Sequence, residues 1–248
     1  MIFSDIKIFE KINKIPMKEE YRDIIEKESN GQDLWWPIAI HPKQDSGIII
    51  INYPGYNGDI DGFNNKYGKL AQFMQENIGA VLRSPNIEHN SIDYSESVKD
   101  DLKALIEYAL KNSERICGSV NPQIYLMGFS AGASAIAAVA HEFKEVTKIL
   151  LISPSMDAGP EAVLYGLNHF TGEVYIVAGD NDTIVGTRCA PHMFSYVKTD
   201  STHEIIIIPN CDHQFKGTIN GMIMSKAPLW AFLGDTSFPD PDGGIELY

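Results

Sequence analysis

The stretch Gln123-Ile124-Tyr125-Leu126-Met127-Gly128-Phe129-Ser130-Ala131-Gly132 decides the fold, because it joins an apolar run of strand length to an alanine-rich segment. Its last five residues have the pattern G-x-S-x-G, and the alanine-rich segment covers residues 131–141. A serine between such glycines sits on a turn so sharp that side chains two positions away would collide with the neighbouring chain. The pattern therefore predicts a buried strand, a strained turn at Ser130 and a helix that begins directly after it.

Further apolar runs of strand length recur on both sides of this stretch, at residues 47–52, 80–83, 148–152, 173–178 and 203–209. Their continuous apolar character is typical of strands that are covered on both faces. Helical segments at 100–111, 131–141 and 217–232 alternate with them. Near the start, runs at 21–29 and 32–41 flank Asn30-Gly31, which is a hairpin signal. We therefore expect an α/β fold: a mostly parallel central sheet of about eight strands, an antiparallel N-terminal hairpin and helices on both faces.

The composition is that of a globular protein with a sizeable core. Of the 248 residues, 44% are hydrophobic and 21% are charged, which does not predict disorder. No internal repeat or linker divides the chain, so we expect one domain over residues 1–248, with an N-terminal extension at 1–20. The tail at 234–248 contains prolines, glycines and only acidic charges, and we expect it to be mobile.

Charge and cysteine content exclude several classes of function. The net charge of −13 repels phosphate backbones, so nucleic acid is not an expected partner and strongly anionic substrates are disfavoured. No segment approaches the ~18 consecutive apolar residues of a membrane span, and the start does not resemble a signal peptide. The three cysteines predict neither a disulfide framework nor a zinc site. We expect a cytoplasmic protein that needs no metal or cofactor; the sequence does not predict its oligomeric state.

A serine hydroxyl is a weak nucleophile at neutral pH, so a nucleophilic Ser130 requires a base. Of the seven histidines, only His213 directly follows the last apolar strand. The loop there lies at the carboxyl edge of the sheet, on the same side as Ser130. His213 is therefore the predicted base.

The acid that orients the base should come from another loop at the same edge. The loop after the strand at 173–178 offers Asp180 and Asp182. Asp180 leaves the strand directly, whereas Asp182 lies deeper in the loop. We favour Asp182 as the acceptor of the imidazole N–H, with Asp180 as the alternative.

Three motifs resemble the α/β-hydrolase superfamily: GFSAG at 128–132, GDNDTIV at 179–185 and CDHQF at 211–215. Their order along the chain is nucleophile, acid and histidine, as in that superfamily. The likeness covers residues 21–233. It implies that the last aspartate of the G-x-x-D-x-x-V loop, Asp182, is the acid of a catalytic triad with Ser130 and His213.

The resemblance also implies an oxyanion hole after the third strand. Gly55 matches the glycine of that motif, so the backbone N–H of Tyr56 is the expected first donor. The second donor is the N–H of Ala131, the residue after the nucleophile. Pro54 stands where the family commonly has histidine, which is a departure from its pattern.

We therefore expect a serine hydrolase that acts on small soluble carboxylic esters through an acyl-enzyme on Ser130. A thioesterase or small-peptide and amide hydrolase with the same triad is the alternative. Only residues 153–172 separate the expected strands at 148–152 and 173–178, so any lid inserted between them is small. A catalytically silent binding member of the fold is the alternative of another class. A Rossmann-like nucleotide binder is disfavoured, because GFSAG lacks the G-x-G-x-x-G spacing.

Overall fold

Eight strands form one sheet in the computed structural model, which describes residues 20–29, 32–89, 93–198 and 200–248. The strand order is β1-β2-β4-β3-β5-β6-β7-β8. The strands are β1 (Tyr21–Ser29), β2 (Gln32–His41), β3 (Ile48–Tyr53), β4 (Ala80–Arg83), β5 (Gln123–Phe129), β6 (Val146–Ile152), β7 (Glu173–Gly179) and β8 (His203–Ile208).

The pairing of the strands confirms the predicted fold. β1 pairs with β2 and β2 with β4 in antiparallel orientation, and the other neighbours are parallel. The carboxyl ends of β3 to β8 therefore meet at one edge of the sheet. The Asn30-Gly31 turn and all but the last residue of the expected extension at 1–20 lie outside the described residues.

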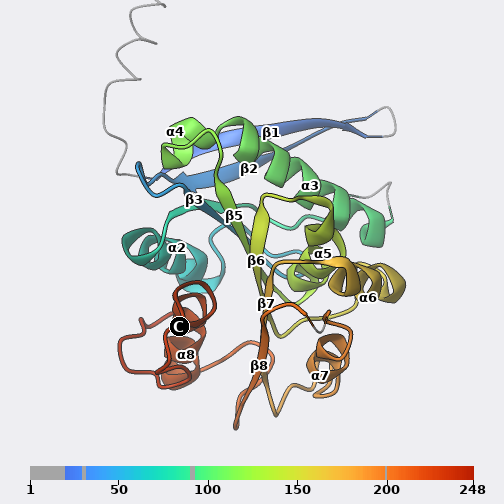
Figure 1. Cartoon of the computed structure of the whole chain (residues 1–248), viewed down its shortest axis with the longest axis vertical. Helices are drawn as coiled ribbons and strands as arrows, with labels where there is room; N and C mark the ends of the chain where they lie inside the picture. The colour runs from blue at the N-terminus through green and yellow to red at the C-terminus, as the bar shows by residue number, and fades with distance from the viewer. Residues whose placement is uncertain (1–19, 30–31, 90–92, 199) are drawn as a thin grey trace, which may run out of the picture.

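Helices cover both faces of the sheet (Figure 1). They are η1 (Phe63–Asn65), α2 (Lys66–Asn77), α3 (Tyr94–Lys111), α4 (Ser113–Cys117), α5 (Ala131–Val139), η2 (Ala140–Glu142), α6 (Pro160–His169), α7 (Cys189–Phe194) and α8 (Thr218–Leu233). The predicted helix at 100–111 begins earlier, at Tyr94, because the Asp93 carboxylate accepts the backbone N–H of Ser95 at 2.8 Å and caps that end.

The side chains of each sheet face form a separate core. On one face, α3, α5, α6 and α7 pack on alternating strand residues such as Ile49 and Leu126. On the other face, α2 and α8 pack on the residues between them, such as Ile50 and Met127. Because both faces are buried, the central strands need apolar residues at every position, which explains their continuous apolar runs.

The tail at 234–248, for which the sequence predicts mobility, makes packing contacts in the structure. It packs along α8, with Leu247 fully buried and the Phe238 ring stacked on Trp230 at a centroid distance of 4.9 Å. The prolines, glycines and acidic residues that suggested mobility are interspersed with apolar side chains, and these make the packing favourable.

No helix in the described part of the chain is long and apolar enough to cross a bilayer.

The start of α5 lies unusually close to the end of β3. A Cβ on Gly132 would lie 2.3 Å from the carbonyl oxygens of both Tyr53 and Pro54. Backbone atoms of a central strand cannot move away without breaking the sheet, so only glycine fits there.

We predict that Gly132→Ala destabilises the protein by about 1–3 kcal/mol through overpacking. In a helix without this clash, replacing glycine by alanine stabilises the protein by about 1 kcal/mol. The clash therefore reverses the sign of the expected change in stability. Gly55→Ala is the matched control: its Cβ would lie 3.2 Å from the nearest atoms of Phe129 and Ser130, an overlap of only a few tenths of an ångström. Thermal unfolding followed by circular dichroism measures both; equal melting temperatures for the two variants would contradict the prediction.

Candidate active site

Ser130 occupies the turn between β5 and α5 in a strained conformation, with φ 53° and ψ −117°. Its backbone N–H donates to the carbonyl of Ile152 on β6 at 2.9 Å, and its own carbonyl accepts the N–H of Ser134 at 3.0 Å. These bonds hold a left-handed backbone that a non-glycine residue adopts only at a cost. The predicted strained turn is therefore present, and it lifts the Ser130 side chain above the carboxyl edge of the sheet.

His213 lies in the loop after β8 and reaches Ser130. Its Nε2 is 3.1 Å from the Ser130 Oγ, and its side chain is 7% exposed. The loop can approach because β7 ends in glycine: a Cβ on Gly179 would lie 2.0 Å from the carbonyl oxygen of Cys211. The geometry suits an imidazole whose Nε2 accepts the serine hydroxyl proton.

Asp182 lies on the other side of the imidazole. Its Oδ2 is 2.7 Å from His213 Nδ1, and its Oδ1 accepts the backbone N–H groups of Ile184 at 3.0 Å and Val185 at 3.1 Å. Each oxygen of this buried carboxylate therefore has a donor, so the side chain is fixed. Asp180, the alternative acid, is exposed and has no recorded contact with His213 among the described residues.

The structure thus brings Ser130, His213 and Asp182 into one hydrogen-bonded line. Each comes from a different loop at the carboxyl ends of β5, β7 and β8, which are near neighbours in the sheet. Hydroxyl, imidazole and carboxylate in this arrangement can transfer a proton away from the serine and stabilise the resulting imidazolium.

The loop after β3 lies directly beside Ser130. A Cβ on Gly55 would lie 3.2 Å from the Ser130 Cβ, so the backbone at Gly55, directly before Tyr56, adjoins the Ser130 side chain. Ala131 is the first residue of α5, where helix geometry leaves the backbone N–H without an intrahelical acceptor. Of the two predicted donor residues, Ala131 directly follows the serine, and Tyr56 follows the glycine that adjoins it.

Two residues that sequence reasoning missed hold this loop in place. The Asn86 side chain donates to the carbonyl of Pro54 at 3.0 Å, and its backbone N–H donates to that of Gly58 at 2.9 Å. Arg83, which is 1% exposed, donates to the carbonyl of Ile60 at 2.7 Å. Arg83 ends β4 and Asn86 follows it closely. Their position at the carboxyl edge of the sheet is the sequence feature that could have identified them.

Aromatic and acidic side chains follow Gly55 and Ser130 in the surrounding loops. The Tyr56 ring meets Tyr94 edge-on at 4.7 Å, and the Tyr56 hydroxyl donates to the Glu88 carboxylate. The Ser155 N–H donates to the Ser130 carbonyl at 3.4 Å, and the Ser155 hydroxyl donates to Asp157 at 2.6 Å.

The cysteine thiols nearest the site remain protonated. Burial raises the pKa of Cys211 to about 12, with Asp212 and Asp180 adding to the effect. Burial also raises the pKa of Cys189, next to Asp182 and Asp157. A thiol is nucleophilic only as the thiolate, so neither competes with Ser130. Within the described ranges, no three His, Cys, Asp or Glu side chains gather as a metal site would require.

The segment expected to form at most a small lid belongs to the helical layer. It contains α6, which packs directly on α5: a Cβ on Gly166 would lie 2.1 Å from the carbonyl oxygen of Ala137.

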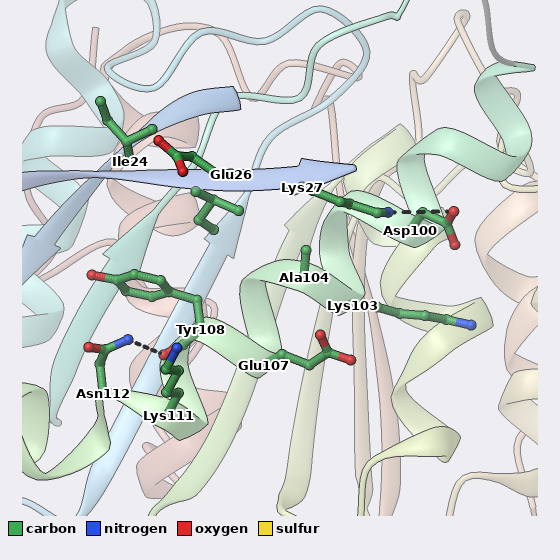
Figure 2. A pocket seen from close by; sticks show the side chains of 11 residues that line it. Ile24, Glu26, Lys27, Asp100, Lys103, Ala104, Glu107, Tyr108, Lys111 and Asn112 are labelled. Carbon is green, nitrogen blue, oxygen red and sulfur yellow. Dashed lines mark hydrogen bonds and ion pairs between the residues drawn. The ribbon is translucent and has the colours of Figure 1, made fainter. Parts of the chain in front are cut away.

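A groove of about 660 Å³ lies between β1 and α3, away from these residues (Figure 2). β1 is four strands from β5, or about 19 Å at the usual strand spacing of ~4.8 Å. The groove contains both acidic and basic side chains, and Lys27 and Asp100 pair across it at 3.5 Å. We therefore do not count it as part of the candidate active site.

Comparison with known proteins adds a family to this geometry. The family model described as the dienelactone hydrolase family matches residues 86–227, which is more than half of the chain. No curated protein sequence is significantly similar to the chain.

Several solved structures share the fold at low sequence identity. A dienelactone hydrolase from Anabaena variabilis is 13% identical with a TM-score of 0.71, and the match covers 88% of this chain and 98% of that one. Est1E from Butyrivibrio proteoclasticus is 16% identical with a TM-score of 0.64, covering 82% and 95%. An alpha-beta serine hydrolase homologue from Coxiella burnetii is 17% identical with a TM-score of 0.63, covering 86% and 96%.

Proposed function

The chain belongs to the dienelactone hydrolase family, and we propose that it hydrolyses carboxylic esters of small soluble substrates through an acyl-enzyme on Ser130. The observation that carries the proposal is the line from Ser130 Oγ through the imidazole of His213 to Asp182, with distances of 3.1 and 2.7 Å. Membership of the superfamily supports the reaction class, and the named residues supply the chemistry.

In the first half of the reaction, Ser130 Oγ attacks the acyl carbon while His213 Nε2 takes the hydroxyl proton. Asp182 accepts the Nδ1–H of His213, which selects the required tautomer and stabilises the imidazolium. The carbonyl oxygen becomes negatively charged and accepts the backbone N–H groups of Tyr56 and Ala131. When the tetrahedral species collapses, the ester C–O bond breaks and the leaving alcohol takes the proton from His213.

In the second half, a water molecule attacks the acyl-serine and His213 takes a proton from it. Collapse of the second tetrahedral species releases the carboxylic acid and returns the proton to Ser130 Oγ. No redox partner or metal enters this balance. The same residues also serve for thioesters and small amides, which differ only in the leaving group.

The proposal is tested with a phosphonylating serine probe and with p-nitrophenyl esters of increasing chain length. We expect the probe to label wild type and not Ser130→Ala. Ester kcat should fall by at least about 10⁴-fold in Ser130→Ala and His213→Ala, because the nucleophile and the base act as one unit.

The matched control is Ser195→Ala, which removes an exposed hydroxyl that bonds only to the His192 carbonyl at 2.7 Å. It should retain labelling and turnover. A folded wild-type protein that neither reacts with the probe nor hydrolyses any ester of the series would favour a binding protein instead, and turnover that survives Ser130→Ala would reject the mechanism.

The two aspartates of the loop after β7 should differ sharply. Asp182→Asn places an amide against His213 Nδ1 and disfavours the required tautomer, so we expect kcat/KM to fall by about 10³–10⁴-fold. Asp180→Asn changes an exposed side chain in the same loop and should leave kcat/KM close to wild type. Comparable losses in both variants would show that activity depends on the loop as a whole and not on the bond from the Asp182 carboxylate to His213.

The reaction should depend on pH through the base. Only a neutral imidazole accepts a proton, so kcat/KM for a neutral ester should rise from acidic toward neutral pH. Stopped-flow release of p-nitrophenol, which isolates the acylation step, is the appropriate measurement. A flat acylation rate over this range would exclude His213 as the base.

A further inference from the structure

The tail at 234–248 ends beside the loop that carries His213. Figure 1 places the C-terminus next to α8, along which the tail packs. The backbone N–H of Ile245 donates to the Ser225 hydroxyl on α8 at 2.8 Å, and Leu247 is fully buried. Gly221 on α8 leaves room for the last ring: a Cβ there would lie 3.0 Å from Tyr248 Cδ2. The position of Tyr248 is therefore set by packing along the whole helix.

The hydroxyl of Tyr248 bonds to the residue that follows the base. It donates to the backbone carbonyl of Gln214 and accepts from the Lys66 ammonium at 3.3 Å. Burial, with Asp212 and Cys211 adding to it, raises the pKa of Tyr248 to about 12, so the hydroxyl keeps the proton that it donates. The loop thus has an anchor one residue from His213 that comes from outside the loop.

Lys66 extends this contact to the nucleophile turn. It begins α2 and is 8% exposed. Its Nζ lies 5.1 Å from the ring centroid of Tyr67, 5.2 Å from that of Phe129 and 5.3 Å from that of Tyr248. Such cation–π contacts strengthen when the cation is withdrawn from water. Burial lowers the pKa of Lys66, and the nearby Asp59 carboxylate acts in the opposite direction. The surrounding ring faces also favour the charged ammonium.

Phe129 closes the chain of contacts. It directly precedes Ser130, and its ring lies 5.1 Å from the imidazole of His213. The tail, α2 and the nucleophile turn therefore meet around the buried Lys66 ammonium, and the histidine loop contacts Tyr248 and Phe129.

We propose that Tyr248 is a positioning residue: its hydroxyl, supported by Lys66, fixes the His213 loop relative to Ser130. The inference rests on the proposed ester hydrolysis. Tyr248 does not touch the reacting atoms, and it acts by restricting the loop. A base must be held within about 0.5 Å of its productive position, and loops need such support more than helices do.

The test compares Tyr248→Phe with wild type in ester turnover and probe labelling. Phenylalanine keeps the ring on Gly221 and Lys66 and removes only the hydroxyl. We expect kcat and the phosphonylation rate to fall roughly tenfold with KM unchanged, which corresponds to the loss of one hydrogen bond at the base loop. The melting temperature is measured in parallel, and Tyr165→Phe, an exposed tyrosine on α6, is the matched control.

A second variant tests the same contact from α2, without a change in the tail. Lys66→Met removes the ammonium but retains an unbranched chain among the rings. Its effect on kcat should not add to that of Tyr248→Phe in the double variant, because both act through one hydroxyl.

Unchanged kcat in folded Tyr248→Phe overturns the positioning role, and so does a loss of kcat that only follows a smaller folded fraction. If wild type shows neither turnover nor labelling, the proposed ester hydrolysis itself is wrong. This result is distinct from an unchanged kcat in Tyr248→Phe, which overturns only the positioning role.

Discussion

The left-handed backbone at Ser130, with φ 53° and ψ −117°, is the constraint on which the rest of the structure depends. An ordinary residue in this region costs of order 1–3 kcal/mol, so the surroundings must hold it. They do so from both sides: β6 accepts the Ser130 N–H, and the first turn of α5 uses its carbonyl. The neighbouring glycines allow this closeness, since a Cβ on Gly128 would lie 2.6 Å from the backbone nitrogen of Ala133.

The parallel sheet turns this local strain into an arranged site. Strands that run the same way end at one edge, so loops far apart in the sequence converge above it. The residues of the site therefore lie only a few positions past the strand ends: Asp182 after β7, His213 after β8 and Gly55 after β3. Each of these loops is fixed by buried backbone contacts, and Asn86, Arg83 and Tyr248 supply further anchors from other elements.

Sequence reasoning could predict what depends on local pattern. Continuous apolar runs indicated the central strands, and the glycines around Ser130 indicated the strained turn. The spacing of Asp182 and His213 after their strands placed them at the correct edge. The contacts of Asn86 and Tyr248 could not be predicted in the same way, because each joins elements whose separation in space depends on the finished sheet. The packing of the tail could not be predicted for a related reason: its few apolar residues become informative only once α8 offers a surface to bury them.

The central claim is that Ser130 carries the acyl group between two half-reactions. Rapid quenching of the enzyme with p-nitrophenyl acetate, followed by peptide mass spectrometry, tests it most directly. We expect an acetyl adduct on the peptide that contains Ser130, formed at the rate of the p-nitrophenol burst and lost at the rate of steady-state turnover. Turnover with the adduct on another residue, or adduct decay slower than turnover, would contradict it.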